Sequence, residues 1–332
     1  MIGSLAATLN SAAIVQGLTI SPSTRPRVSV LMPCYNCEKY LEEALQSIAD
    51  QTFASFEIVF VNDGSTDSSL AIARRFAGTD TRMIIIDQAN GGIVTALNAG
   101  LAVCRGEYVA RMDADDVSFP DRLGYQVDYM DSNPGCVIVG GLAVNNPTMA
   151  GATIKTRSRS HRRTNLRLFP PKVASALHPL IMIRRRALVA IGGYRAGFAH
   201  AEDYDLYIRL RAHGTIDNPR KHVLFYRRHE AAISIRFLEI QEQAAAAAEY
   251  DAMRGDGIAL PPEWLCQPYL RLRIWRRYQD GAPDKARAMR ATMLGDLLNL
   301  HPRTLICRRY FRLRLLILAA TLRWATRRSS CR

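Results

Sequence analysis

Short runs of apolar and β-branched residues alternate with amphipathic stretches between Arg27 and Gly141. This alternation is typical of strands joined by crossover helices in a largely parallel sheet. We expect strands at 27–33, 56–63, 82–88 and 106–113, and helices at 37–51, 67–77 and 93–104. The first of these helices has its apolar positions on one side, at Tyr40, Leu41, Ala44, Leu45 and Ile48. The pattern therefore predicts an α/β fold with a mostly parallel sheet flanked by helices.

The second half of the chain has a weaker pattern. The stretch 156–170 is basic and lacks apolar periodicity, so a solvated loop is the default, and a flap over a negatively charged substrate is the alternative. A strand, a short helix and a glycine turn are expected within 176–194, a helix at 201–214, an edge strand at 222–229 and a helix at 239–254. Two prolines at 261 and 262 then mark a break.

The net charge of +14 belongs mainly to the C-terminal part of the chain. From Pro268 to the end there are sixteen Lys and Arg against three Asp and Glu, so the rest of the chain is close to neutral. A charge of this size is also found in nucleic-acid-binding basic proteins, but no nucleic-acid motif is present, and we expect no nucleic-acid partner.

The stretch 305–328 can form a helix with an apolar stripe and arginines beside it. Such a helix suits an anionic membrane surface, and packing on the rest of the protein is the alternative. The longest apolar run, 315–322, is too short to span a bilayer. The first 26 residues lack a basic segment and a clear cleavage site, so we expect a loose extension rather than a secretory signal.

Seven cysteines are scattered without a repeated spacing, and Cys34 and Cys37 form the one CxxC. A zinc site requires a second ligand pair and a redox pair requires a thioredoxin-like context. Neither is evident, so we expect ordinary reduced thiols and a cytoplasmic protein.

Three polar loops follow the predicted strands, and the third is the most acidic. These loops are PCYN, NDGSTD and DADD. In open parallel sheets, ligands bind beyond the carboxyl ends of the strands, so we expect one site assembled from all three loops. In the third loop Asp113, Asp115 and Asp116 lie within four positions. A solvated turn and a pair of acid/base carboxylates are possible, but Mg²⁺ or Mn²⁺ best accounts for the clustered charge.

Two further features fit a nucleoside diphosphate. Asp63 can accept an N–H from a base edge, and Gly64 and Ser65 open the next helix. Gly91 and Gly92 precede a helix N-terminus, whose backbone amides suit a diphosphate. For each feature alone, a turn with a helix cap is the better explanation, whereas together with a metal site they describe a pocket for a nucleoside diphosphate.

The ordered motifs resemble the glycosyltransferases of family 2, which have the Rossmann-like GT-A fold. The resemblance covers about 27–234 and runs through VSVLMPCYN, FVNDGSTD, NGGIVTALNAGL, GEYVARMDADD, GGY and AEDYDLYIRL. It implies an inverting, metal-dependent hexosyltransferase that uses a UDP-, dTDP- or GDP-sugar. We divide the chain accordingly into an extension (1–26), a catalytic domain (27–235) with donor-binding (27–141) and acceptor (142–235) halves, and a helical, basic C-terminal region (236–332).

The resemblance also implies roles for individual residues. Pro33 and Tyr35 line the base pocket, and Asp63 holds the base. Asp113 contacts the ribose and metal-bound water, whereas Asp115 ligates the Mn²⁺ or Mg²⁺ ion. Asp116 only shapes the following turn.

The catalytic base and a further metal ligand are expected in the acceptor half. Asp203 is the base, with Glu202 as its orienting neighbour; without the resemblance, this pair is explained by the acidic first turn of a helix. His229 is a metal or diphosphate ligand and Arg227 a donor contact, although a lone histidine is more often a surface or packing residue. The full expected donor-binding set is Pro33, Tyr35, Asn36, Asp63, Gly64, Ser65, Asn90, Gly91, Gly92, Asn98, Arg111, Met112, Asp113, Ala114, Asp115 and Arg227.

The sequence departs from the family pattern in two places. Leu97 stands where many members have an arginine that can contact phosphate. We therefore expect Arg111 or later arginines to contact the donor phosphates instead. The Q-x-x-R-W motif of processive members is absent, which indicates transfer of one sugar at a time.

We therefore expect transfer of a sugar to a glycan or lipid-linked acceptor in bacterial cell-surface polysaccharide synthesis, on the inner face of the cytoplasmic membrane. A dehydrogenase is disfavoured because PCYN replaces the glycine fingerprint after the first strand. The closer alternative is a sugar nucleotidyltransferase, for which a glycine- and basic-rich loop is expected there.

Overall fold

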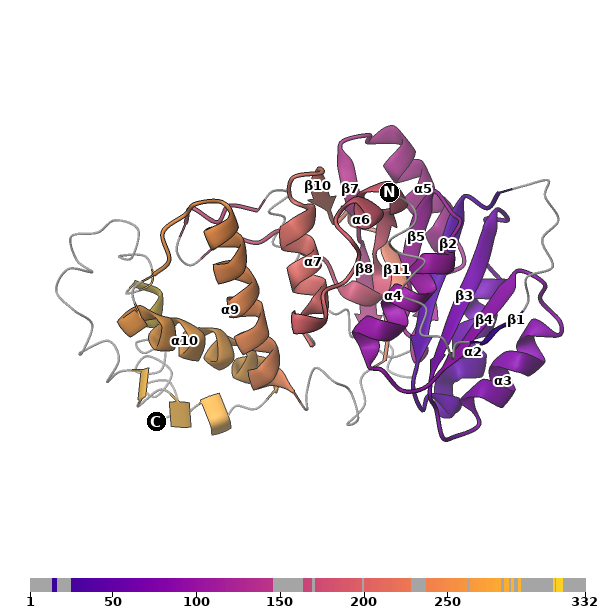
Figure 1. The fold of residues 1–332 in the computed structure, drawn as a ribbon, viewed down its shortest axis with the longest axis horizontal. Coiled ribbons are helices and arrows are strands. Elements are labelled where there is room, and N and C mark those ends of the chain that lie inside the picture. The colour runs from indigo at the N-terminus through magenta and orange to yellow at the C-terminus, as the bar shows by residue number, and fades with distance from the viewer. Residues whose placement is uncertain are drawn as a thin grey trace, which may run out of the picture. The chain divides into compact units, whose positions relative to one another are not determined.

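The computed structural model describes residues 14–16, 25–145, 164–168, 171–198, 200–227, 237–261 and 263–281, and short pieces between 284 and 318 (Figure 1). The chain forms two compact units, one made of 1–163 and 174–229 and the other of 164–173 and 230–332. The boundary near 230 lies close to the expected one at 235, but 164–173 belongs with the second unit.

The first unit is built on a sheet that has eight strands within the described residues. Their order across the sheet is β1-β4-β3-β2-β5-β9-β7-β10. The central members β2 (Val28–Cys34), β3 (Phe56–Asp63), β4 (Met83–Gln88) and β5 (Tyr108–Arg111) are parallel. The predicted α/β class, with a mostly parallel sheet and helices, is confirmed.

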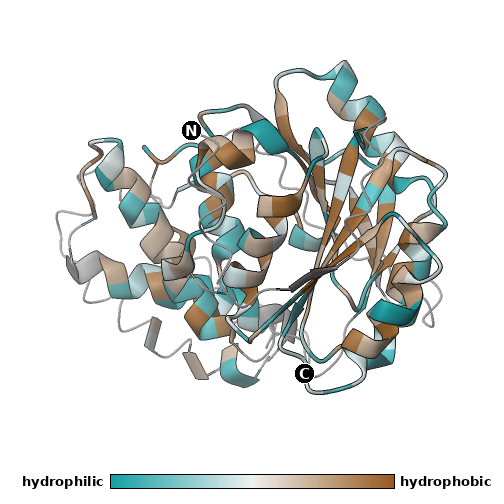
Figure 2. Cartoon of the chain, turned by 45° about the vertical axis from the view of Figure 1, so that its right-hand side comes forward, coloured by the Kyte–Doolittle hydropathy of each residue, from teal (hydrophilic) through white to brown (hydrophobic). Residues whose placement is uncertain are grey.

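The core explains why these runs become strands. Every side chain of β2 and β3 is buried, so both faces of the central sheet are covered (Figure 2). The covering helices include α2 (Glu38–Ala49), α3 (Ser69–Ala77) and α4 (Ile93–Val103). α2 contacts α3, and α4 contacts β2 and β3. The expected helices at 37–51, 67–77 and 93–104 are therefore present with slightly shorter bounds.

Short elements from the end of the donor-binding half and from the acceptor half complete this sheet. α5 (Arg122–Ser132) leads to β7 (Cys136–Val139), and η1 (His178–Leu180) precedes β9 (Met182–Arg184) and α6 (Arg185–Ala190). A second 3-10 turn, η2 (Ala196–Phe198), α7 (Glu202–Leu210) and β10 (Thr215–Asp217) follow. β1 (Ile14–Gln16) pairs antiparallel with β4, so the expectation of a wholly loose N-terminal extension is wrong for these three residues.

A small second sheet lies beside the acidic loop. It has the order β6-β11-β8, with β6 (Val117–Ser118), β11 (His222–Tyr226) and β8 (Leu142–Asn145). The strand expected at 222–229 is thus confirmed over 222–226, but it is the middle strand rather than an edge. Because β6 directly follows the DADD loop, its pairing with β11 brings Arg227 to that loop.

The second unit contains α9 (Leu238–Gly255) and α10 (Glu263–Gly281), which pack against each other. Arg273 joins them by ion pairs to Glu242 (2.7 Å) and to the fully buried Glu249 (2.6 Å). Among the described helices, none is long and apolar enough to cross a membrane. Most of the helix expected at 305–328 lies outside the described residues.

Candidate active site at the carboxyl ends of the strands

Three carboxylates converge where β5 ends. Asp113, Asp115 and Asp116 each place an oxygen within 4.8 Å of the others. Asp113 and Asp115 are half-buried, whereas Asp116 is fully buried. One Asp116 oxygen accepts a bond from the Arg227 backbone N–H (2.8 Å), and the other has no hydrogen-bond partner within the described chain. Asp116 therefore does more than shape the turn, which corrects our expectation for this residue.

The electrostatics of this cluster favour a cation. Burial, and after it the charges of Asp113 and Asp115, raise the pKa of Asp116 well above its ordinary value. Clustered oxygen ligands of this kind are those that Mg²⁺ and Mn²⁺ take, and a bound cation would offset the mutual repulsion. The residues present therefore fit a hard divalent ion at this loop.

Arg111 lies beneath the cluster and forms an ion pair with Asp113. Its side chain is buried, and although burial opposes its charge, the charge of Asp113 raises the pKa of Arg111. Arg111 thus stays cationic and holds one carboxylate of the loop. Its nearest partner is Asp113, and its expected contact with donor phosphate stays a prediction.

A second buried arginine, Arg122 of α5, supports the strand end from behind. Its guanidinium donates to the Arg111 carbonyl (2.6 Å), to the Met112 sulfur (3.3 Å) and to Gln126 (3.2 Å). Burial lowers the pKa of Arg122 to about 9. Met112 is fully buried and Ala114 nearly so, and their expected places in the donor site stay predictions.

Arg227 fixes the acidic loop from the opposite side. Besides its backbone bond to Asp116, its Nε donates to the Asp115 carbonyl (2.7 Å) and one Nη donates to Glu43 (2.6 Å). Its guanidinium also lies over the Tyr40 ring, 4.5 Å from the centroid. Arg227 therefore positions Asp115 and Asp116, and its expected contact with the donor stays a prediction.

Asp63, at the end of β3, organises the glycine turn before α4. Its two carboxylate oxygens accept the backbone N–H groups of Gly91 and Gly92, both at 2.9 Å, and one also accepts the Gln88 amide (2.8 Å). The glycine amides thus bind Asp63, which corrects the expectation that they are offered to a diphosphate. Gly64 has φ +70°, and a Cβ there would lie 2.6 Å from the Asn90 nitrogen, so this turn requires glycine.

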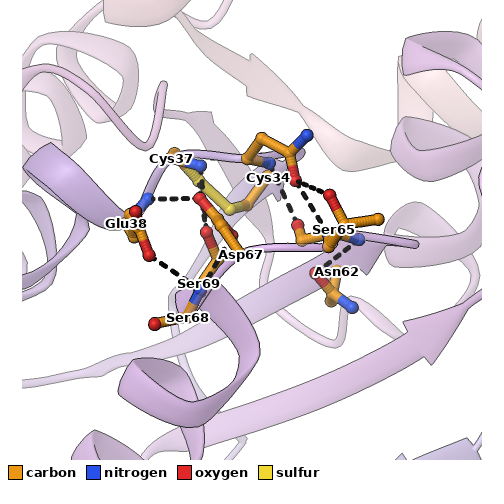
Figure 3. The surroundings of a disulfide bond; sticks show 10 residues. Cys34, Cys37, Glu38, Asn62, Ser65, Asp67, Ser68 and Ser69 are labelled. Carbon is orange, nitrogen blue, oxygen red and sulfur yellow. Dashed lines mark hydrogen bonds between the residues drawn. A yellow bond between two sulfur atoms is a disulfide. The ribbon is translucent and has the colours of Figure 1, made fainter.

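The loops after β2 and β3 are joined to one another (Figure 3). The Asn36 N–H donates to Ser65 Oγ (3.1 Å), and the Thr66 N–H donates to the side-chain Oδ1 of Asn36 (2.8 Å). The Glu38 N–H donates to Asp67 (3.0 Å), and Glu38 in return accepts the Ser68 N–H (2.8 Å). This reciprocal bonding holds the two loops together.

A disulfide between Cys34 and Cys37 closes the first of these loops (Figure 3). The expectation of reduced thiols is therefore wrong for this pair, whereas Cys104, Cys136 and Cys266 are free. The physical reason is Asn36, whose φ of +53° turns the chain back so that the two Cα atoms lie 6.2 Å apart. The loop presents Tyr35, 54% exposed, as a free aromatic face.

Glu202 and Asp203 begin α7 as predicted. Glu202 is 9% exposed, and one of its oxygens has no hydrogen-bond partner among the described residues. Burial, and next the charge of Asp203, raise the pKa of Glu202 to about 7, and Asp113 contributes in the same direction. The two carboxyl groups therefore lie within electrostatic reach of each other and of the acidic loop. The protonation of Glu202 therefore changes near neutral pH.

Asn98 connects α4 to the GGY turn. Its amide accepts the Tyr194 N–H (2.9 Å) and donates to the Tyr194 carbonyl (2.8 Å), so its side chain is used in positioning. The Tyr194 hydroxyl lies 3.0 Å from Nε2 of the buried His178. Burial, and then Arg111, lower the pKa of His178, which is therefore neutral.

The sequence did not predict that Arg122 and Tyr194 support the site. It also did not predict that Asp116 accepts the Arg227 N–H and belongs to the acidic cluster. A buried arginine and a buried tyrosine carry no motif of their own, although GGY was noted as a turn. His229, expected as a metal or diphosphate ligand, lies outside the described residues. The donor roles of Pro33, Tyr35, Asn36, Ser65 and Asn90 stay predictions.

Comparisons with known proteins agree with this geometry. The family model for glycosyl transferase family 2 matches residues 29–192. The putative glycosyltransferase EpsE of Bacillus subtilis (strain 168) is 33% identical over 195 residues, covering 57% of this chain and 68% of EpsE. The amylovoran biosynthesis glycosyltransferase AmsE of Erwinia amylovora is 34% identical, covering 56% of this chain and 70% of AmsE. Chondroitin synthase of Escherichia coli is 31% identical over 66% of this chain, which spans 31% of that larger enzyme.

Solved structures share the fold at low identity. The mannosyltransferase PcManGT from Pyrobaculum calidifontis, in complex with GDP-Man and Mn²⁺, has a TM-score of 0.59 at 22% identity, covering 91% of this chain and 87% of its own. TarS 1-349 of S. aureus, in complex with UDP-GlcNAc, has a TM-score of 0.56 at 17% identity, covering 89% of this chain and 81% of the TarS chain. Both likenesses support the α/β architecture described above.

Proposed function

Because the chain belongs to glycosyltransferase family 2, we propose that it is an inverting, metal-dependent enzyme that moves a sugar from a nucleoside-diphosphate sugar to an acceptor hydroxyl. The observation that carries this proposal is the convergence of Asp113, Asp115 and Asp116 at the carboxyl edge of the sheet. The Cys34–Cys37 loop and the Asp63 turn supply an exposed tyrosine and a fixed backbone at the same edge.

The donor would lie across the carboxyl edge of the strands. Tyr35 would stack on the base, and Asp63 would hold the base edge while also fixing the glycine turn. Asp113, Asp115 and Asp116 would hold Mn²⁺ or Mg²⁺, which when bound neutralises the charge that develops on the leaving diphosphate. Arg227 and Arg111 would keep these carboxylates in place through the contacts described above.

Asp203 would act as the general base. It would take the proton from the acceptor hydroxyl as that oxygen attacks the anomeric carbon, while the bond from this carbon to the diphosphate breaks. Attack on the face opposite the leaving group inverts the anomeric centre, so no covalent enzyme intermediate is required. Glu202 would orient Asp203 as its neighbour, and burial and the charge of Asp203 raise the pKa of Glu202 to about 7.

The biological setting is inferred from relatives. AmsE is named for amylovoran biosynthesis, and WbnJ of Escherichia coli, 32% identical over 185 residues, for O-antigen biosynthesis. By analogy, the acceptor is a glycan or lipid-linked saccharide of a bacterial cell-surface polysaccharide. The basic C-terminal region would hold the enzyme on the anionic inner face of the cytoplasmic membrane.

Thermal shift with a panel of nucleotide sugars, with and without Mn²⁺, tests the proposed function. We expect one donor to raise the melting temperature in a metal-dependent way, because ligand binding to the folded state stabilises it. The same donor with a hydroxyl acceptor should release nucleoside diphosphate and give the product of inverted anomeric configuration. Formation of a nucleotide sugar from a sugar phosphate and a nucleoside triphosphate would instead identify a sugar nucleotidyltransferase.

The membrane proposal has its own test. Replacing Arg308, Arg309, Arg312 and Arg314 by Gln in the full chain should weaken flotation with phosphatidylglycerol vesicles, because each basic residue near the surface contributes about 1 kcal/mol. Unchanged flotation would contradict a membrane role for this region.

A further inference from the structure

A basic pocket lies at the edge of the sheet opposite the acidic loop. It has a volume of about 420 Å³, and its charged lining comprises Arg25, Arg27, Glu107, Arg184, Arg185 and Arg186. Arg27 and Glu107 directly precede β2 and β5, and Arg184 ends β9, which runs antiparallel to β5. β2 has seven residues, so the two edges are separated by roughly 20 Å of strand. The pocket is therefore distinct from the proposed donor site.

Two guanidinium groups are held in place by neighbouring backbone carbonyls. Nε of Arg25 donates to the Arg105 carbonyl, and Nε of Arg185 donates to the Gly106 carbonyl, both at 2.7 Å. The bond at Nε fixes each guanidinium, and within the described chain no acceptor binds the Nη groups of either residue. Arg186 is exposed and has no ion pair or hydrogen bond to a described residue.

The other charged side chains of the pocket already have partners. Glu107 pairs with Nε of Arg27 (3.1 Å), and the Nη2 group of Arg27 binds Asp131 (2.9 and 3.0 Å). Arg184 is buried, and it donates to the carbonyls of Cys136 (2.8 Å) and Met130 (2.7 Å). Arg184 has no anionic partner either, but each of its guanidinium nitrogens has an acceptor. Arg25, Arg185 and Arg186 keep Nη groups for which the described chain supplies no acceptor, at one concave surface.

We infer that this pocket binds the phosphate or diphosphate group of a ligand other than the donor sugar nucleotide at the metal site. Arginine suits phosphate because its planar fork of N–H groups matches the oxygens in geometry and charge. The volume falls in the range of small-molecule sites, about 300–1,000 Å³, so the pocket has room for more than a single inorganic anion. The phosphate belongs either to a soluble metabolite or to a lipid headgroup.

Calorimetric titration of the full chain with pyrophosphate tests this inference. EDTA is included so that the acidic loop, without its cation, does not hold the probe. We expect saturable binding to the wild type, weakened about tenfold or more in Arg25→Ala/Arg186→Ala, since two charge-assisted contacts are lost. The matched control Arg220→Ala/Arg254→Ala removes the same charge from exposed positions outside the pocket and should bind within about twofold of wild type.

Two outcomes would overturn the inference: no saturable binding to the wild type, or equal weakening in the pocket variant and the control. The single variant Arg186→Ala, at an exposed position, replaces the double variant if the latter does not fold. Because the titration requires neither metal nor donor, its failure would leave the proposed transferase function unaffected.

Flotation with phosphatidylglycerol vesicles separates the two phosphate sources. If the pocket variant floats less than the control, which carries the same net charge, the ligand is a lipid headgroup. Equal flotation together with lost pyrophosphate binding assigns a soluble phosphorylated ligand.

Discussion

The two edges of the central sheet carry opposite charge, although the same strands run between them. At the carboxyl edge, β5 ends in the loop that holds Asp113, Asp115 and Asp116. At the amino edge, residues beside the same strands contribute to a pocket in which three arginines have Nη groups without an acceptor in the described chain. The interior of β2 and β3 is buried throughout, so the strand ends are where the chain places its binding chemistry.

The edges also differ in how their charges are held. The carboxylates are packed against one another, and burial and repulsion raise the pKa of Asp116 and of Glu202. Arg25 and Arg185 are held by the backbone carbonyls of Arg105 and Gly106, which are neutral and leave the positive charge of both guanidinium groups in place. The carboxyl edge is therefore poised to take a cation, and the amino edge to take an anion. Changes at the carboxyl edge should affect transfer, whereas changes at the amino edge should not.

The largest effect is expected for Asp203→Asn. Loss of a general base should lower kcat by about a hundredfold to ten-thousandfold. Donor binding should persist, because Asp203 lies on α7 rather than in the loops assigned to the donor. Steady-state kinetics together with metal-dependent thermal shift measure both quantities. If kcat of Asp203→Asn lies within tenfold of the wild-type value, Asp203 is not the general base.

The next largest expected effect is on the protein's stability, which should depend on pH through Glu202. Its pKa is raised from 4.5 to about 7 in the folded state, so between these values the folded protein holds more protons than the unfolded chain. Stability therefore falls as pH rises through this window, by up to about 3 kcal/mol in the metal-free protein. Glu202→Gln should remove this fall and be more stable than wild type at pH 8, with little difference at pH 4.5. Parallel curves of unfolding free energy against pH would contradict this assignment.

A smaller effect is expected at the loop after β2. Cys37→Ser removes the disulfide to Cys34, and closing so short a loop contributes about 2 kcal/mol to the free energy of unfolding. Denaturant unfolding should show this loss in the variant. Reductant should lower the free energy of unfolding of the wild type to that of the variant and leave the variant unchanged. A wild type whose free energy of unfolding does not change with reductant would contradict the disulfide.

The smallest effect on transfer is expected at the amino edge. Arg25→Ala/Arg186→Ala should leave kcat and donor KM within about twofold of wild type, because distant sites without shared partners act independently. A large loss of transferase activity in this variant would contradict the claim that the two edges act independently.

The central strands of the first half were predictable because they are long and mostly apolar. β2 and β3 have seven and eight buried residues, and such runs are identified without knowledge of their partners. β1, β7 and β10 have three or four residues, so pairing with neighbours rather than their own pattern makes them strands. The same holds for β11, whose central place depends on β6 and β8.

At the site, the sequence predicted residue types better than their partners. The acidic loop was identified from its charge, but Arg122 and Arg227 act through contacts that span 11 and 112 positions. Asp63 meets Gly91 because β3 and β4 pair with Asp63 opposite Gln88, a register that no local pattern specifies. The disulfide likewise depended on the left-handed conformation of Asn36.

The most direct test of the central claim is the metal-dependent thermal shift of Asp115→Ala. Wild type is expected to be stabilised by its nucleotide sugar with Mn²⁺ and far less without the ion. Asp115→Ala should lose this metal-dependent difference and its transferase activity, while retaining the fold, because Asp115 is only half-buried. A variant that keeps the full Mn²⁺-dependent shift and transfers sugar at a near wild-type rate would contradict a metal site at the carboxyl edge.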